Sequence, residues 1–138
     1  MVEPARLLFD TGALIDIYRG RPAMRAHFQA VANGELGAFL SVVSEAELWR
    51  GVKPLEVERH EAILAHFTAL PLESAAARLA GEWMQRYESR GLGWMALEQR
   101  DALIAATARE AGLALLTRDA RLAGVLADKV EFEVYRAD

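Results

Sequence analysis

One acidic residue of this sequence lies where a helix would need an apolar side chain. Asp101 begins the stretch DALIAATA, and helical spacing places it in one row with Leu97, Ile104 and Ala108. An ionised carboxylate that is buried without a partner costs on the order of several kcal/mol or takes up a proton. Asp101 therefore needs a counter-charge, which could be an arginine such as Arg6 or a bound cation.

Further acidic residues follow short apolar runs. Asp10 ends the run RLLFD, Glu45 and Glu47 come after LGAFLSVV, and Asp119 comes after LALLT. If these runs are parallel strands, their carboxyl ends meet at one edge of a sheet, where α/β proteins form their sites. We therefore expect these side chains to gather there, and Asp101 to join them from the helix that leads into LALLT.

Carboxylates gathered in this way require a positive charge between them. Two of them about 5 Å apart repel by roughly 3 kcal/mol at an effective dielectric constant of about 20. The sequence has no cysteine, and its histidines, His27, His60 and His66, fall in helical segments away from the strand ends. Oxygen ligands alone suit Mg²⁺ or Mn²⁺ better than Zn²⁺. A divalent cation held by carboxylates is typical equipment for attack on a phosphodiester.

Most of these acids also have a structural explanation. Asp10 and Asp119 stand just before predicted helices, where an aspartate cap is worth about 1 kcal/mol. Ser44 and Glu47 have the S-x-x-E spacing of a capping box. For any one of these residues the structural explanation is the more economical. Their combination with Asp101, which capping does not explain, favours a functional site.

The elements that would position these residues alternate along the chain. Apolar runs predict strands over 6–9, 36–43, 113–117 and 130–135, the last with the strict alternation of an edge strand. Helical spacing predicts helices over 12–19 and 22–33, from Ser44 onward, and over 55–69, 74–91, 95–111 and 119–128. This order predicts a three-layer α/β/α sandwich around a mainly parallel sheet of about four to five strands.

The composition is that of an ordinary globular protein. The chain has 138 residues, of which 53% are hydrophobic and 26% charged, so we expect one domain over residues 1–138. The first ten residues, MVEPARLLFD, do not resemble a signal peptide. No apolar stretch approaches the roughly 20 residues that cross a bilayer. We therefore expect a cytoplasmic protein.

The net charge of −4 argues mildly against a nucleic-acid partner, because such proteins usually present a basic surface. A gathering of several acids in one site would leave the rest of the surface closer to neutral. Several basic residues near the predicted strand ends could contact phosphates: Arg19, Arg21, Arg50, Lys53, Arg118 and Arg121.

Three blocks of the sequence are FDTGALIDIYRG, SVVSEAELWRG and RDALIAATAREAGLALLTRDARL, in this order. In type, order and spacing they resemble VapC-type toxins of the PIN-domain family. The resemblance implies a PIN-like sandwich with four metal-site acids: Asp10, Glu47 (rather than Glu45), Asp101 and Asp119. It also implies three supporting hydroxyl residues: Thr11, Ser44 and Thr117. One departure is that the segment before Asp101, GLGWMALEQR, lacks the proline often found there.

The same resemblance implies an Mg²⁺- or Mn²⁺-dependent endoribonuclease that acts as the toxin of a toxin–antitoxin pair. Its substrates would be structured RNAs such as tRNA or rRNA, hydrolysed by metal-activated water. Asp119 would bind the metal either directly or through water.

Two protein partners are also implied by the resemblance, a cognate antitoxin and a second copy of the chain in a homodimer. The antitoxin's C-terminal segment would lie along a hydrophobic groove and place a basic side chain at the acidic pocket. The residues that could line this groove are Leu14, Ile17, Tyr18, Leu48, Trp49, Val52 and Leu55. For most of them packing in the core is the simpler explanation, and Trp49 is the best candidate for exposure.

Other functions stay open at this point. A housekeeping RNA-processing PIN nuclease would have the same site without an antitoxin, and a non-catalytic PIN module would only dock RNA or protein. A receiver domain also has acids at its strand ends, but it needs a lysine at the end of its last strand. Lys129 precedes that strand here, which disfavours a receiver domain.

Overall fold

The computed structural model describes residues 3–89 and 97–137. Its strands form one five-stranded sheet in the order β3-β2-β1-β4-β5, and every neighbouring pair is parallel. The strands are β1 (Ala5–Phe9), β2 (Leu36–Ser41), β3 (Thr68–Leu70), β4 (Ala114–Thr117) and β5 (Phe132–Val134). The parallel sheet predicted from the sequence is confirmed, with β5 at one edge as expected.

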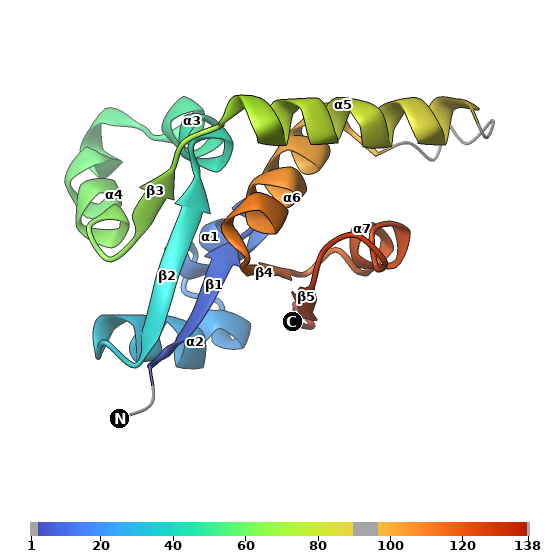
Figure 1. Cartoon of the computed structure of the whole chain (residues 1–138). Coiled ribbons are helices and arrows are strands. Elements are labelled where there is room, and N and C mark those ends of the chain that lie inside the picture. The colour runs from blue at the N-terminus through green and yellow to red at the C-terminus, as the bar shows by residue number, and fades with distance from the viewer. Residues whose placement is uncertain (1–2, 90–96, 138) are drawn as a thin grey trace.

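Helices cover both faces of this sheet, and in Figure 1 α6 lies in front of β1 while α1 lies behind it. The helices are α1 (Thr11–Tyr18), α2 (Pro22–Ala32), α3 (Val42–Gly51), the 3₁₀ turn η1 (Pro54–Glu56), α4 (Val57–Leu64), α5 (Ser74–Ser89), α6 (Gln99–Ala111) and α7 (Ala120–Val125). The predicted three-layer α/β/α sandwich is therefore confirmed. Among the described residues, no helix is both long and apolar enough to cross a membrane.

The two faces of the sheet bury separate apolar clusters. Leu8 of β1 and Leu115 of β4 pack with α5, α6 and α7 on one side. Phe9 and Leu116, their successors in the chain, pack with α1 to α4 on the other side. All four side chains are fully buried, and burial of each stabilises the fold by about 1.5–3 kcal/mol. The carboxyl ends of β1 and β4 are thus fixed from both faces.

The central strand β1 is the point at which the order of the strands reverses. The chain passes from β1 to β2 and β3 on one side, and β4 and β5 follow on the other side. In open parallel sheets, ligands bind outside the carboxyl ends of the strands at such a reversal. The residues that follow β1, β2 and β4 in the chain are therefore the ones to examine for function.

The segment 55–69 differs most from its prediction as one helix. It contains part of η1, then α4, and finally the edge strand β3, which pairs with β2. Phe67 does not continue the helical face but packs edge-to-face on Phe9, with ring centroids 5.1 Å apart. Leu55 is fully exposed. A three-residue strand is too short to show its own periodicity, so the helical spacing of the apolar residues was misleading here.

Several predicted boundaries also shift. Strand β2 ends at Ser41 rather than at 43, because α3 begins at Val42, two residues before Ser44. The described part of α5 runs to Ser89 and α6 begins at Gln99. The predicted end of one helix at 91 and the predicted start of the next at 95 lie outside the described residues.

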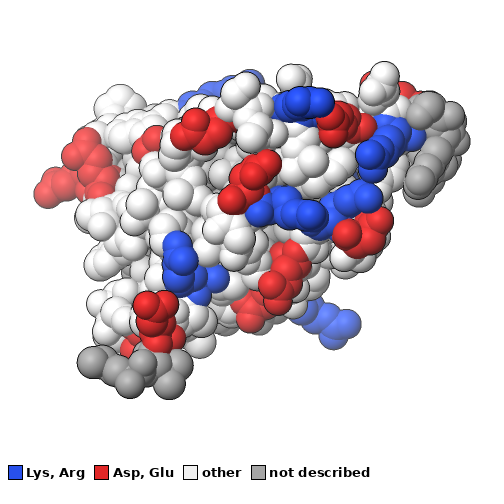
Figure 2. All heavy atoms as spheres, in the orientation of Figure 1, with Lys and Arg blue, Asp and Glu red and all other residues white. Residues whose placement is uncertain are grey.

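The surface charge is mixed. On the face shown in Figure 2, acidic and basic side chains are interspersed rather than gathered into one basic surface. A polyanion approaching this face would meet individual basic side chains close to acids, so any phosphate contact there depends on how single arginines are positioned.

Candidate active site

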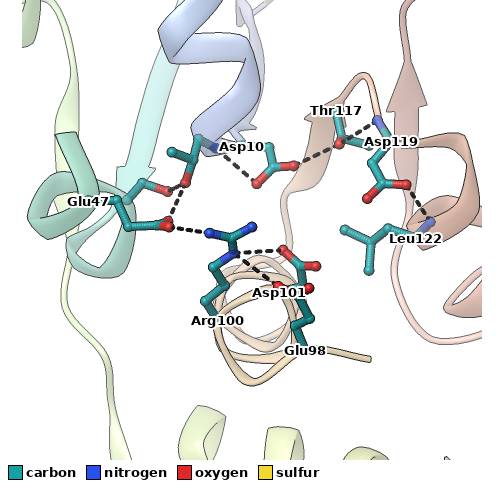
Figure 3. A network of polar contacts seen from close by, with 10 residues as sticks. Asp10, Glu47, Glu98, Arg100, Asp101, Thr117, Asp119 and Leu122 are labelled. Carbon is teal, nitrogen blue, oxygen red and sulfur yellow. Dashed lines mark hydrogen bonds and ion pairs between the residues drawn. The ribbon is translucent and has the colours of Figure 1, made fainter. Parts of the chain in front are cut away.

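The carboxyl end of the sheet contains an acidic pocket of about 380 Å³. Five acids line it, among them the four predicted ones on four different segments: Asp10 after β1, Glu47 on α3, Asp101 on α6 and Asp119 after β4. The fifth is Glu98, the N-cap of α6, which was not predicted. Figure 3 shows their side chains converging on one space. The sequence predicted this gathering from the strand ends, and the structure brings all four residues to one pocket. Glu45 does not line it, in agreement with the choice of Glu47.

Asp10 is held by the two residues next to it in space. It is the N-cap of α1, where its Oδ1 accepts a hydrogen bond from the backbone N–H of Thr11 (2.9 Å). Its Oδ2 accepts the hydroxyl proton of Thr117 (2.7 Å). Burial raises the pKa of Asp10, these hydrogen bonds lower it, and the charges of Asp119 and Glu47 raise it further. The cap was predicted, and the same carboxylate also faces other acids.

Asp101 lies in the first turn of α6, and its side chain is 15% exposed. It is therefore less buried than its row of apolar neighbours suggested, although Leu97, Ile104 and Ala108 are indeed in the core. Burial and then the charge of Asp10 raise the pKa of Asp101 to about 6, while Arg100 opposes them. The charge of Asp10 thus raises the pKa of Asp101 across this pocket, as expected when acids share a site.

An ion pair between Asp101 and Arg6 was the alternative explanation for this residue, and it is wrong. The guanidinium of Arg6 lies over the ring of Phe39, with its Cζ 4.9 Å from the ring centroid. The cation beside Asp101 is Arg100, at 3.9 Å.

Glu47 is held by a chain of hydroxyl groups. Thr11 donates its hydroxyl proton to Glu47 Oε1 (2.8 Å), and the hydroxyl of Ser44 lies 2.8 Å from that of Thr11. Ser44 is fully buried inside α3. The predicted capping box of Ser44 and Glu47 is wrong, because α3 is capped by Ser41, whose hydroxyl accepts from the N–H of Val43. The carboxylate of Glu47 is thereby directed to the pocket rather than to the end of its helix.

Asp119 lines the pocket from the turn after β4, and Thr117 supports it from behind. Asp119 caps α7 by accepting from the N–H of Leu122 (3.0 Å), as its position in the sequence predicted. Its own N–H donates to the hydroxyl of Thr117 (3.0 Å). Thr117 thus links Asp10 to the turn that presents Asp119, and a single hydroxyl fixes the relative position of two acids.

Arg100 is a part of the pocket that sequence reasoning missed. Its guanidinium lies 3.0 Å from Glu47, 3.4 Å from Glu98 and 3.9 Å from Asp101, as Figure 3 shows. Glu47 contributes most to raising the pKa of Arg100 above its usual value. A cation in the first turn of a helix opposes the helix dipole. The sequence EQRD at the start of α6 was therefore a signal that this arginine has acidic partners.

Asp16 is a second residue that sequence reasoning missed. It lies on α1 and is fully buried. Its Oδ1 pairs with Arg118 (2.9 Å) and Arg21 (3.3 Å), and its Oδ2 accepts the hydroxyl proton of Tyr135 (2.6 Å). The signal was an acid within the apolar run ALIDIY. Arg21 was expected to contact phosphates, but its guanidinium forms an ion pair with this buried carboxylate.

The donor set of the acidic pocket fits an oxygen-preferring divalent cation. All four predicted acids offer carboxylate oxygens, the ligands that Mg²⁺ and Mn²⁺ prefer. Burial is the largest cause of the raised pKa values of Asp10 and Asp101, and the charges of neighbouring acids add to it. Within residues 3–89 and 97–137, however, no three acids or histidines are grouped closely enough to hold a metal as they stand. Arg100 lies among them, so a cation would have to take its place beside Glu47.

A groove of about 360 Å³ adjoins the acidic pocket between α1, α3 and α4. Glu47 lines both hollows. Of the seven apolar residues predicted to form a groove, Tyr18, Leu48 and Val52 line it, with Arg19 and Lys53. Leu14 and Ile17 are instead buried in the core, and exposed Leu55 is not in its lining. Trp49 is 41% exposed, as expected, and packs on the ring of His60.

Comparisons with known proteins agree with the geometry. The family model of the PIN domain matches residues 7–126. Ribonuclease VapC10 of Mycobacterium tuberculosis is 38% identical over 116 residues, which are 80% of each chain. A toxin–antitoxin complex from Klebsiella pneumoniae is 26% identical, with a TM-score of 0.71 over 93% of this chain and 96% of that one. DNA-bound VapBC from Salmonella typhimurium shares the fold, with a TM-score of 0.77 and 18% identity over 94% and 98% of the two chains.

The chain therefore belongs to the PIN-domain family. Its similarity to VapC10 confirms the resemblance to VapC-type proteins seen in the sequence blocks.

Proposed function

We propose that this protein is an endoribonuclease that depends on a divalent cation and acts as the toxin of a toxin–antitoxin pair. The observation that carries the proposal is the convergence of Asp10, Glu47, Asp101 and Asp119 on one pocket at the carboxyl end of the sheet. The 38% identity to a ribonuclease of the VapC type supports the same activity.

In this proposal Asp10, Glu47 and Asp101 hold Mg²⁺ or Mn²⁺, and Asp119 binds it directly or through water. The cation supplies an activated water and stabilises negative charge on the phosphate during hydrolysis. The hydroxyls orient the acids: Thr11 holds Glu47, and Thr117 holds Asp10 and the backbone before Asp119. No side chain of the pocket needs to act as a nucleophile, which agrees with the absence of cysteine in the sequence.

The groove beside the pocket supports an antitoxin as partner. A bound segment with apolar side chains could pack on Tyr18, Leu48 and Val52, and a basic side chain from it would reach Glu47, which the groove and the pocket share. The similar structure from Klebsiella pneumoniae is itself a toxin–antitoxin complex. This groove favours the toxin over a housekeeping nuclease that works without an antitoxin. A homodimer and tRNA or rRNA as substrates stay predictions.

A non-catalytic module that only docks RNA or protein is the competing function. Such a module has no use for burying Asp10 and Asp101 where desolvation and neighbouring carboxylates raise their pKa values, because that placement destabilises the fold. The unfavourable placement of these acids favours an enzyme.

The test is cleavage of a purified mixture of tRNA and rRNA by antitoxin-free protein, with Mg²⁺, with Mn²⁺ and with excess EDTA. Asp101→Asn is the test variant. Glu45→Gln is its matched control, because Glu45 is an acid that lies outside the pocket. We expect discrete cuts with metal, no cuts with EDTA or Asp101→Asn, and normal cuts with Glu45→Gln. Cleavage that persists in Asp101→Asn would refute the proposed site, and binding without cleavage by a folded wild type would favour the non-catalytic module.

A further inference from the structure

Arg118 reaches across the start of α1 at the rim of the acidic pocket. It stands in the chain between Thr117 and Asp119, and it lines the pocket together with Asp119 and Gly12. A Cβ atom at position 12 would lie 2.9 Å from Nε of Arg118 and 3.5 Å from its Cζ. The absence of a side chain at Gly12 therefore allows the guanidinium to lie directly against the backbone that follows Asp10.

This guanidinium is anchored from outside the site. Its Nη1 donates to Oδ1 of Asp16 at 2.9 Å, and Asp16 is fully buried and does not line the acidic pocket. Tyr135 holds the other oxygen of Asp16, and the backbone N–H of Tyr135 donates to the carbonyl of Thr117 at 3.1 Å. Helix α1, the turn after β4 and the end of β5 are thus joined at one buried carboxylate.

The anchor leaves much of Arg118 facing the pocket. Its side chain is 38% exposed, and a guanidinium has five N–H donors, of which the contact with Asp16 uses one edge. Arg100 differs, because its guanidinium is paired with Glu47 and other acids of the pocket itself. The pocket acids repel a phosphate that enters between them. An arginine that is not paired with these acids can offset that repulsion.

We propose that Arg118 binds a backbone phosphate of the RNA at the acidic pocket, and that Asp16 and Tyr135 are the residues that position it. A guanidinium matches two phosphate oxygens with parallel N–H groups. An arginine that is already held in place loses less conformational entropy when it binds than a mobile one. This inference rests on the proposed nuclease function, since it assigns a contact with the substrate of that activity.

The experiment measures binding of a fluorescently labelled tRNA mixture in EDTA, where cleavage is absent, at several salt concentrations. Arg118→Gln is compared with Arg21→Gln, which removes a cation from the same oxygen of Asp16 but not from the pocket lining. We expect Arg118→Gln to weaken binding about tenfold and to reduce the salt dependence by about one phosphate contact. Arg21→Gln should bind RNA within about twofold of wild type.

Two further variants separate binding from folding. Arg118→Lys keeps a positive charge beside Asp16 but loses the paired N–H groups of the guanidinium. We therefore expect the salt dependence of wild type, with an RNA affinity between those of wild type and Arg118→Gln. Tyr135→Phe removes one hydrogen bond from Asp16 without changing any charge, and should weaken RNA binding by less than Arg118→Gln. Thermal unfolding of each variant checks that it is folded at the assay temperature.

Steady-state cleavage with Mg²⁺ distinguishes failure of the role proposed for Arg118 from failure of the proposed nuclease function. In Arg118→Gln we expect KM to rise by the same factor as the dissociation constant, with a smaller change in kcat. If wild type cleaves RNA but Arg118→Gln and Arg21→Gln bind it equally well, the role of Arg118 is refuted and the nuclease function stands. If wild type shows no metal-dependent cleavage, the proposed function fails and this inference fails with it.

Discussion

Two buried aspartates lie at helix α1, Asp10 at its N-cap and Asp16 within it, and their negative charges are compensated to different degrees. Asp16 is fully buried and has two guanidinium groups and a tyrosine hydroxyl around its oxygens. Asp10 is 9% exposed and receives one backbone N–H and one threonine hydroxyl. Its charged neighbours include Asp119 and Glu47, which add to the effect of burial in raising its pKa.

The difference is the one expected between a structural carboxylate and the functional one that we propose for Asp10. A buried charge that serves the fold is compensated within the fold, because uncompensated burial is costly. Asp10 and Asp101 are not compensated to the same degree, and perturbed acids in a cleft are typical of functional sites. In the proposed function, a bound divalent cation would supply the positive charge that these two acids lack.

The largest effect on stability is expected from Asp16→Asn. The amide is neutral, so the buried ion pairs with Arg118 and Arg21 are lost even if its oxygen still accepts hydrogen bonds from them. Breaking a buried pair in this way costs about 3–5 kcal/mol. Urea unfolding measures the loss, with Glu82→Gln as control, because Glu82 belongs to an exposed pair with Arg78 and should cost under about 1 kcal/mol. Equal stability of the two variants would show that Asp16 is not structural in the sense argued above.

Asp10→Asn should have the opposite profile. We expect cleavage to fall by at least about 100-fold, since even residues that only support metal ligands contribute 10- to 100-fold. Stability in EDTA should be unchanged or higher at neutral pH, because the substitution removes a carboxylate whose pKa is raised by burial and by other acids. Thermal unfolding in EDTA and cleavage in Mg²⁺ are measured on the same preparation. A strongly destabilised variant would mean that the hydrogen bond from Thr117, rather than the chemistry, is the main role of Asp10, because asparagine caps a helix as well as aspartate does.

Three acidic segments of the pocket could be predicted from the sequence because topology alone brings strand ends together. Asp101 was inferred from helical spacing, the choice of Glu47 over Glu45 came from the family resemblance, and Glu98 was not predicted. Asp10, Asp119 and the segment with Glu47 follow strands whose carboxyl ends meet in any parallel sheet. Asp16 and Tyr135 could not be paired in this way, since they are 119 positions apart in the chain and meet only when β5 joins β4. Capping was an incomplete guide, because Ser41 caps α3 where Ser44 was expected to do so.

The third prediction concerns the pH dependence of stability in EDTA. The pKa of Asp101 is raised to about 6 from 3.8, first by burial and then by the charge of Asp10. Between about pH 4 and pH 6 the native state thus binds more protons than the unfolded chain, and it loses stability as the pH rises through that window. Asp101→Asn removes this loss, so its stability relative to wild type should increase from pH 4 to pH 6 and then level off.

Thermal unfolding of both proteins across this pH range measures the effect. Asp128→Asn is the matched control, because Asp128 is an exposed acid paired with Lys129, and the effect assigned to Asp101 is the variation in excess of that in this control. A difference for Asp101→Asn that varies no more than that of the control would mean that Asp101 is compensated in the native state, as Asp16 is.

The smallest effect, and the sharpest test of the comparison, is expected from Arg100→Gln. Arg100 is the cation nearest to Glu47, but its side chain is 58% exposed, whereas the cations of Asp16 are tied to a buried network. Exposed ion pairs are worth about 1 kcal/mol or less. Binding of a metal that displaces this guanidinium therefore loses a weak ion pair, which the variant does not have. We expect Mn²⁺ to bind Arg100→Gln about three- to fivefold more tightly than wild type.

Calorimetric titration with Mn²⁺ measures this change, and Arg50→Gln is the matched control. Arg50 lines the same pocket and its substitution removes the same formal charge, so the difference between the two variants isolates the contacts of Arg100 with the acids. If Arg100→Gln bound Mn²⁺ more weakly than Arg50→Gln, the ion pair of Arg100 with Glu47 would be structural, like the ion pairs that Arg21 and Arg118 form with Asp16. The uncompensated part of the pocket would then be reduced to Asp10 and Asp101, and metal binding would have to be assigned chiefly to those two carboxylates.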